Sequence, residues 1–252
     1  MDSTTIISTW IKEPHLVDGW SILGSPHQVP RPSLWLIDID RAHAILSNRY
    51  SQLLSEAELT RSSRFHQPAH AARYQTTHTM LRILLAGTSQ SNPATLQFVG
   101  ERHNKPRLSS DHRSIAFNLS YAEGKSMIGI ADGAAIGIDI EWSHRPIVVE
   151  DMLAVCFSTN EINYITSQQD GVLSRFFTLW TRKEAILKLT GEGIGEHLPF
   201  FEVLDGACVA EKRIIGGNPP DRVYLYSFHL HTGYVGCYAT SEPINHLSIY
   251  EL

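Results

Sequence analysis

Four short patterns each occur twice along the chain, in the same order, and this repetition constrains the fold more than any other feature. The matched segments and their offsets are LIDID 36–40 with GIDIE 137–141 (101), LSEAEL 54–59 with FSTNEI 157–162 (103), RILLAG 82–87 with ILKLTG 186–191 (104) and LQFV 96–99 with FEVL 201–204 (105). One such match arises by chance, but four in order with a slowly drifting offset indicate an internal duplication. We therefore predict an α+β fold in which two similar α/β lobes, 1–134 and 135–252, are related by a pseudo-twofold axis. A cleft between two such lobes is a natural place for a ligand.

Local signals predict similar elements in both halves. Capping boxes, which begin helices, are present at Ser55-x-x-Glu58 and Ser158-x-x-Glu161. Helices are expected over 70–86, ending at Gly87, and over 172–190, ending at Gly191. Strands are expected over 96–99 and 201–204, and hairpins are expected to turn at 123–124 and 232–233. Residues 1–33 show little periodicity and are expected to be irregular.

Composition excludes several classes of protein. The chain has 252 residues, a net charge of −5 and three cysteines, no two of which have CxxC spacing. A disulfide scaffold is disfavoured, and so is a general nucleic-acid binder, which is more often basic. No apolar stretch approaches the roughly 18 residues of a membrane span, and the N-terminus lacks the pattern of a signal peptide. We expect a cytoplasmic protein with no membrane segment and no nucleic-acid partner.

Asp139 and Glu141 lie two residues apart on a predicted strand. Because side chains alternate across a strand, both carboxylates face one side, while Ile138 and Ile140 face the core. Neighbouring carboxylates repel each other unless a cation lies between them, and Mg²⁺ takes oxygen ligands of this kind. The alternative is a solvated strand face, and this pair by itself leaves both interpretations open.

The predicted helix 172–190 carries a second signal. Trp180, Glu184 and Lys188 have i, i+4, i+8 spacing and share one helix face. Either Glu184 and Lys188 form an ordinary surface pair, or Glu184 joins the carboxylates and Lys188 meets a phosphate. Glu184 aligns near Met80 of the first half, so a catalytic face would exist in one lobe only.

Residues 54–113 contain eight Lys and Arg against four Asp and Glu, which reverses the sign of the overall charge. Arginine contacts phosphate through a fork of donors, so an anionic ligand fits this region, with a solvated helix face as the alternative. Zinc is disfavoured, because the histidine pairs 66/70 and 229/231 have neither a nearby cysteine nor an HExxH frame.

Several segments together resemble a known family. GIDIE at 137–141, followed by WTRKEAILKLTGEG at 180–193, resembles the paired signature of 4′-phosphopantetheinyl transferases of the surfactin-synthetase-activating (Sfp) type. SRFHQPAHAARY at 63–74, HNKPRL at 103–108 and FNLSYAEG at 117–124 are similar to further family motifs. The resemblance implies the two-lobed fold and the transfer of 4′-phosphopantetheine from coenzyme A to a serine of an apo carrier protein.

The resemblance also implies roles for individual residues. Asp139, Glu141 and Glu184 correspond to the family's Mg²⁺-binding carboxylates, and Glu184 is also the candidate general base. Lys188 corresponds to the lysine that contacts the coenzyme A pyrophosphate and assists the leaving group. The implied coenzyme A-binding residues are Arg61, Arg64, Arg73, Lys105, Ser120, Tyr121 and Lys188. The two lobes in one chain imply a monomer.

Two positions depart from the family pattern. Tyr121 stands where the family has a histidine, and Asn104 stands where glycine is usual. Tyrosine keeps one hydrogen-bond donor but does not become cationic. Tyr121 is the one feature that favours a different class of function, a non-catalytic coenzyme A-binding regulator. A metal-dependent nucleotidyltransferase would need a glycine-rich phosphate loop, and the sequence contains none.

Overall fold

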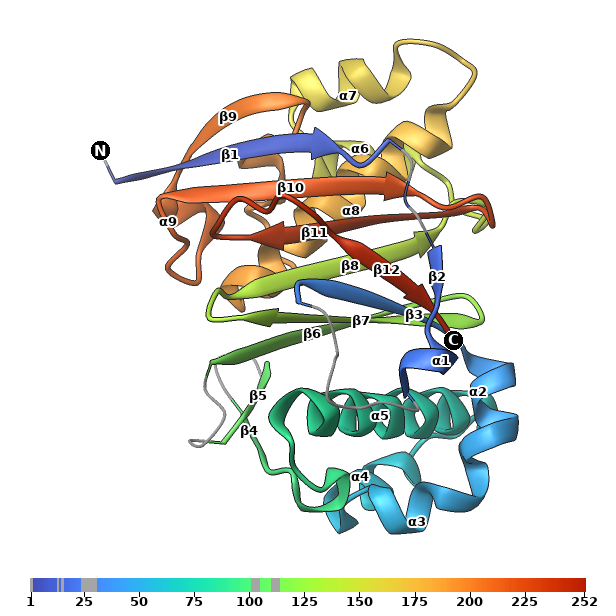
Figure 1. The fold of residues 1–252 in the computed structure, drawn as a ribbon. Helices are drawn as coiled ribbons and strands as arrows, with labels where there is room; N and C mark the ends of the chain where they lie inside the picture. Colours follow the sequence, from blue (N-terminus) through green and yellow to red (C-terminus); the bar gives the residue numbers. More distant parts are fainter. Residues whose placement is uncertain (1, 13, 15, 24–30, 101–104, 110–113) are drawn as a thin grey trace.

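The computed structural model describes residues 2–12, 14, 16–23, 31–100, 105–109 and 114–252. These residues form an α+β fold with two five-stranded sheets (Figure 1). The strand order of one sheet is β2 (Leu16–Asp18), β12 (Ser248–Glu251), β3 (Ser33–Asp38), β7 (Lys125–Asp132) and β6 (Ile115–Ala122). The order of the other is β8 (Ile136–Trp142), β11 (Tyr234–Thr240), β10 (Arg222–His229), β1 (Ser3–Trp10) and β9 (Gly206–Glu211). A separate ribbon pairs β4 (Phe98–Gly100) with β5 (Pro106–Leu108).

Helices accompany both sheets. The first half contains α1 (Trp20–Leu23), α2 (Ile39–Leu46), α3 (Tyr50–Leu53), α4 (Glu56–Ser62) and α5 (Pro68–Ser89), and the second contains α6 (Glu150–Cys156), α7 (Thr159–Thr166), α8 (Val172–Thr190) and α9 (Lys212–Ile215). Single 3-10 turns cover Ser47–Arg49, Pro93–Thr95 and Leu198–Phe200. The two longest helices, α5 and α8, therefore belong to different halves of the chain.

The same order of three strands, β3-β7-β6 and β8-β11-β10, recurs in the two sheets. β3 pairs antiparallel with β7, the second strand of the β6–β7 hairpin, and β8 pairs antiparallel with β11, the second strand of the β10–β11 hairpin. Helices α4 and α7 begin with the predicted capping boxes at Ser55 and Ser158. This order matches the repeat in the sequence, while the pseudo-twofold axis and the division into 1–134 and 135–252 stay predictions.

The prediction of an irregular segment over 1–33 is wrong, because β1 is a regular strand. It pairs with β10 on one side and β9 on the other, and its buried side chains alternate at Thr4, Ile6 and Ser8. The polar Thr4 and Ser8 hide the alternation in the sequence. At the other terminus, β12 pairs with β3 of the first sheet, so each end of the chain joins the sheet of the opposite half.

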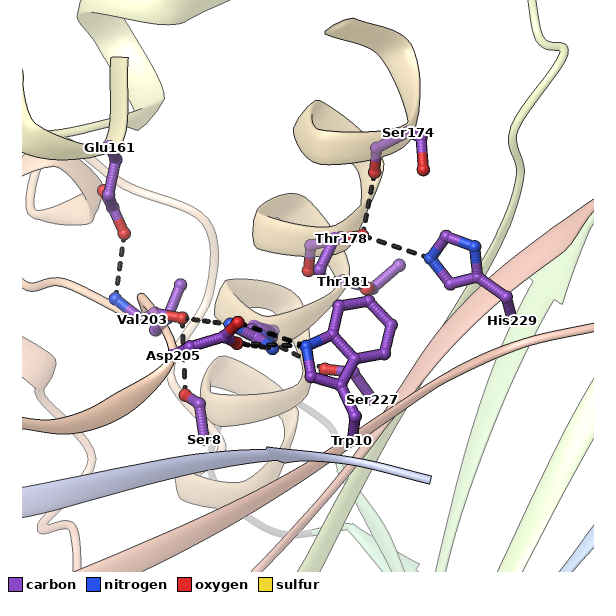
Figure 2. A network of polar contacts seen from close by, with 11 residues as sticks. Ser8, Trp10, Glu161, Ser174, Thr178, Thr181, Val203, Asp205, Ser227 and His229 are labelled. Carbon is purple, nitrogen blue, oxygen red and sulfur yellow. Dashed lines mark hydrogen bonds and ion pairs between the residues drawn. The ribbon is translucent and has the colours of Figure 1, made fainter. Parts of the chain in front are cut away.

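A network of polar contacts connects the end of β1 to α8 (Figure 2). The indole Nε1 of Trp10 donates to Asp205 Oδ1 at 3.1 Å, and the guanidinium of Arg182 lies 5.3 Å from the Trp10 ring. Arg182 also donates to the carbonyl of Val203 at 2.7 Å and to Ser227 Oγ at 2.8 Å. The N-terminal strand is thereby held against the helix that carries Glu184.

Three further boundaries differ from the sequence prediction. No strand forms over 201–204, and β9 begins at Gly206 instead. The alternating apolar residues Phe201 and Val203, which led to the strand prediction, are buried in the core without belonging to a strand. α5 continues past the buried Gly87 to Ser89 and ends at Gln90, whose φ of 54° is left-handed. The strand expected over 96–99 covers 98–100.

Close packing of α8 on β8 depends on Gly137. A Cβ atom there would lie 1.9 Å from the carbonyl oxygen of Ala185. Along the edge of β8 that does not pair with β11, Asn118 Oδ1 and Ser120 Oγ of β6 accept hydrogen bonds from the backbone N–H groups of Ile138 and Ile140, at 2.9 and 3.2 Å. β8 is therefore the strand on which α8 and the first sheet meet.

Candidate active site

One face of α8 lies against β8 and presents three functional groups at successive turns. Trp180 reaches Glu141 at the end of the strand, and Lys188 reaches Asp139 near its middle. Glu184 lies between them along the helix. The i, i+4, i+8 spacing seen in the sequence thus places all three groups over the Asp-x-Glu pair.

Asp139 is the most enclosed of the carboxylates, with 5% of its surface exposed, while Ile138 and Ile140 face the core as predicted. Its Oδ1 accepts hydrogen bonds from Ser120 Oγ and Lys188 Nζ, both at 2.7 Å. Its Oδ2 is buried and has no hydrogen-bond partner among the described residues. A buried oxygen of this kind is costly unless something pairs with it.

Glu184 and Glu141 share this environment. Burial, together with the charges of Asp139 and Glu141, raises the pKa of Glu184 to about 7. Burial and the charge of Asp139 also raise the pKa of Glu141, against the opposing effects of Arg145 and Trp180. Glu184 Oε1, like Asp139 Oδ2, is buried without a hydrogen-bond partner in the described part of the chain.

These carboxylates suit a hard divalent cation. Two unpartnered carboxylate oxygens, in a site where burial and the charge of Asp139 raise the pKa values of Glu141 and Glu184, are suitable donors for Mg²⁺. Within the described residues, no three His, Cys, Asp or Glu side chains already converge as a metal-ligand set. Asp139 Oδ1 is instead paired with the Lys188 ammonium.

Lys105 and Lys188 line a cavity of about 240 Å³ beside the carboxylates, together with Asn118 and Leu187. The Lys105 ammonium donates to the backbone carbonyls of Lys188 at 2.6 Å and Ile136 at 3.0 Å. It therefore stabilises the C-terminal end of α8, where carbonyl groups lack partners within the helix. Asn104, the departure from the family glycine, lies outside the described residues.

A larger cavity of about 660 Å³ lies between α4, α5 and the strands β4 to β6. Arg61, Arg73 and Tyr121 line it, so the structure brings together three of the residues predicted to bind an anionic ligand. The two cavities share Pro106 and Leu119 in their walls, so they adjoin each other along β5 and β6.

Aromatic rings support the cations of this larger cavity. The Arg61 guanidinium lies 5.4 Å from the Tyr74 ring, and the Arg73 guanidinium lies 5.3 Å from the Tyr121 ring. Burial of the phenol raises the pKa of Tyr121 to about 12, although 36% of the side chain is exposed. Tyr121 is therefore a neutral donor at physiological pH, next to a permanent positive charge.

Two predicted binding residues lie elsewhere. Ser120 is 2% exposed and faces β8, where its hydroxyl contacts Asp139 and Lys188 and not the larger cavity. Arg64 is exposed and is not among the residues that line either cavity. The structure thus separates an arginine and tyrosine group from a carboxylate and lysine group.

Two cationic residues, Arg145 near Glu141 in space and Lys183 next to Glu184 in the sequence, were not singled out from the sequence. Arg145 pairs with Glu141, with Nη1 3.2 Å from Oε2, and Trp180 Nε1 donates to Oε1 at 3.2 Å. Lys183 forms an ion pair with Glu161 at 2.8 Å, and both side chains are fully buried. Lys183 therefore belongs to the core, although it lies beside Glu184 in the sequence. The i+4 spacing of Arg145 from Glu141 did not predict their contact, because such spacing brings side chains together on a helix and Glu141 lies on a strand.

Comparison with known proteins places the chain in a family. Residues 135–239 match the 4′-phosphopantetheinyl transferase superfamily (ACPS). The 4′-phosphopantetheinyl transferase HetI of Nostoc sp. is 31% identical over 166 residues, which cover 65% of this chain and 70% of HetI. This chain belongs to the 4′-phosphopantetheinyl transferase superfamily.

Two further relatives agree with this membership. The protein slr0495 of Synechocystis sp., provisionally named as a 4′-phosphopantetheinyl transferase, is 33% identical over 172 residues, 68% of this chain and 69% of the relative. The 4′-phosphopantetheinyl transferase Sfp of Bacillus subtilis is 26% identical over 200 residues, 78% of this chain and 86% of Sfp. The resemblance inferred from the motifs is thereby confirmed.

The match to the family model lies in the half of the chain that holds the carboxylates. The matched segment 135–239 contains Asp139, Glu141, Glu184 and Lys188. In the described part of this superfamily member, none of the helices is both long and apolar enough to cross a membrane.

Proposed function

We propose that this protein transfers the 4′-phosphopantetheine group from coenzyme A to a serine of an apo acyl, peptidyl or aryl carrier protein. The serine oxygen forms a new bond to the phosphorus that bears pantetheine, the diphosphate P–O bond breaks, and 3′,5′-ADP leaves. The observation that carries this proposal is the pair of adjoining cavities. One is lined by arginines, and the other ends at Lys188 beside three carboxylates.

Asp139, Glu141 and Glu184 would hold Mg²⁺ in this proposal. Support comes from the unpartnered buried oxygens of Asp139 and Glu184 and from the mutual repulsion of the three carboxylates. The ion would offset the negative charge of the diphosphate. Proton removal from the carrier serine is assigned to Glu184, directly or through a water molecule, because a carboxylate that accepts a proton is a common general base.

Coenzyme A would extend from the larger cavity to the carboxylates. Arg61, Arg73 and Tyr121 would contact its 3′-phosphate end. Arg64, which is exposed and lines neither cavity, would add positive charge outside the cavity. Lys188 would lie along the diphosphate, where it offsets the charge of the leaving 3′,5′-ADP. Lys105 lines the same cavity, and its three ammonium donors are directed to the backbone carbonyls of Ile136, Lys188 and Leu189, so it would contact the diphosphate by releasing one of these bonds. Ser120 would act beside Lys188, since its hydroxyl accepts a hydrogen bond from that ammonium at 2.9 Å.

The carrier protein would dock on the exposed apolar side of α6. Val148 and Val155 are 60% and 63% exposed, while Cys156 and Phe157 at the end of the same segment are buried. The segment directly follows the strand that bears Asp139 and Glu141, so a carrier bound there would lie near the carboxylates. We further propose that the protein acts in the cytoplasm as a monomer with pseudo-dimeric lobes and activates carriers of secondary metabolism.

A mass assay tests the proposal. Incubation with coenzyme A, Mg²⁺ and an apo carrier should add one phosphopantetheine to the carrier serine, and a panel of carriers would define the preferred class. A carrier that gains no mass, from a protein that still binds coenzyme A, would support the alternative of a non-catalytic regulator. Tyr121, in place of a cationic histidine, is the observation that favours that alternative.

A further inference from the structure

The contact between Trp180 and Glu141 has no counterpart among the roles assigned above. The indole Nε1 donates to Glu141 Oε1 at 3.2 Å. Trp180 is 9% exposed, and its ring lies nearly parallel to that of Phe176, at 6° between the planes and 6.3 Å between centroids. A donor on a ring enclosed in this way has a fixed direction, because neither χ angle of the tryptophan is free to turn.

Arg145 holds the same carboxylate from the solvent side. Its Nη1 lies 3.2 Å from Glu141 Oε2 and 3.4 Å from Oε1. The side chain of Arg145 is 43% exposed, whereas that of Glu141 is 13% exposed. The two partners therefore differ in kind, since one is a fixed neutral donor in the interior and the other is a half-exposed cation on a flexible stem.

We propose that Trp180 is a positioning residue that aims the Glu141 carboxylate at the cation site, and that Arg145 is a displaceable counter-ion for the same carboxylate. The inference rests on the proposed function in one respect, the assignment of Glu141 to a divalent cation. A neutral donor orients a carboxylate without neutralising its charge, so it favours cation binding. A paired guanidinium competes with the cation for the same charge.

Opposite effects on cation affinity test the two roles. Direct titration with Mn²⁺ by electron paramagnetic resonance, without coenzyme A or carrier, measures the affinity without any turnover. Trp180→Phe retains a ring against Phe176 and removes the donor, and it should weaken Mn²⁺ binding by about tenfold. Arg145→Gln should strengthen it by about threefold to tenfold.

Trp142→Phe is the matched control. Trp142 follows Glu141 along β8, so its side chain points to the opposite face of the strand, and this change should leave the affinity within twofold of the wild type. Thermal unfolding of each variant separates a loss of folding from a loss of binding. A Trp180→Phe variant that unfolds like the wild type and binds Mn²⁺ equally well would overturn the positioning role.

A double-mutant cycle with Glu141→Gln shows whether Trp180 acts through Glu141. Trp180→Phe should cause no further loss of Mn²⁺ affinity in the Glu141→Gln background, since the amide leaves no carboxylate to aim. An equal loss in both backgrounds would overturn the inference while leaving the proposed function intact. Absence of Mn²⁺ binding by the wild-type protein would overturn the cation assignment itself, and the positioning role with it.

Discussion

The two halves of the molecule contain a similar buried ion pair, here called the clamp, in different surroundings. In each, the glutamate of a capping box pairs with a cation of the long helix, Glu58 with Arg82 at 2.7 Å and Glu161 with Lys183 at 2.8 Å. Arg82 therefore corresponds to Lys183, at an offset of 101, and the sequence alignment of Arg82 with Ile186 at 104 is wrong by three residues. Each cation also donates to backbone carbonyls at both ends of a 3-10 turn. The carbonyls are those of Pro93 and Leu96 in the first half and of Leu198 and Phe201 in the second.

The difference lies in access to solvent. Glu58 and Arg82 form part of the wall of the larger cavity, whereas Glu161 and Lys183 are fully enclosed. Burial acts to raise the pKa of Glu58, but hydrogen bonds from His78, Arg82 and Ser55 lower it to about 2. Burial raises the pKa of Glu161 and lowers that of Lys183. The buried pair thus borders the larger cavity in one half, and in the other half it is enclosed in the core and holds α8, the helix that carries Glu184.

Removing the carboxylate that only the second half possesses should have the largest effect. Glu184→Gln should lower carrier modification by about 100- to 10,000-fold, the usual contribution of a general base. The rate of mass gain by the carrier, at saturating coenzyme A, is the measurement. Unfolding in urea should stay close to that of the wild type, because Glu184 Oε1 has no hydrogen-bond partner to lose in the described structure. A Glu184→Gln variant with wild-type activity would remove the functional difference between the halves.

The clamps themselves should differ in their contribution to stability. Lys183→Met leaves Glu161 as an unpaired charge in the core and should lower the free energy of unfolding by about 3–5 kcal/mol. Arg82→Met should cost about 1–3 kcal/mol, since water in the cavity, His78 and Ser55 still reach Glu58. Urea denaturation measures both. Equal losses in the free energy of unfolding of the two variants would mean that access to the cavity does not change the contribution of the ion pair to stability.

Lowering the pH should change the contributions of Glu58 and Glu161 to stability in opposite directions. The folded-state pKa of Glu58, about 2, lies below its unfolded value of 4.5, so its contribution is complete above pH 4.5 and is lost as the pH falls towards 2. The raised pKa of Glu161 has the reverse effect, because its protonation favours the folded state as the pH falls. The urea midpoint between pH 5 and 2.5 should therefore fall less steeply in Glu58→Gln than in the wild type. In Glu161→Gln it should fall at least as steeply.

Local chemistry explains which parts of this comparison could be predicted from the sequence. The capping boxes at Ser55 and Ser158, the hairpin turns and the alternation around Asp139 depend on neighbouring residues, and all appear as expected. The family signature assigned Asp139 to Mg²⁺ and Lys188 to a phosphate of coenzyme A, whereas the 2.7 Å ion pair between Lys188 Nζ and Asp139 Oδ1 was not predicted. The roles of these residues in catalysis and binding stay predictions.

Long-range contacts explain what could not be predicted. Strand β1 pairs with β10, which lies more than two hundred residues along the chain, and its polar Thr4 and Ser8 face the interior. The three carbonyls bound by Lys105 belong to Ile136, Lys188 and Leu189, and a side chain bound to distant backbone leaves no pattern in the sequence. Lys183 is another such case, because its neighbours in the signature motif suggested catalysis while its partner Glu161 places it in the core.

The smallest expected effect concerns α2 and α6, the helices that follow the corresponding strands β3 and β8. α2 follows β3 and exposes Ile45 by 49%, and α6 follows β8 and exposes Val155 by 63%. If the carrier docks on α6, Val155→Asp should raise the carrier KM by about five- to tenfold, as expected for one apolar contact of an interface, without changing the affinity for coenzyme A. Ile45→Asp places the same charge on the corresponding helix and should change neither quantity. Equal carrier KM values in the Val155→Asp and Ile45→Asp variants would mean that the carrier does not dock on α6.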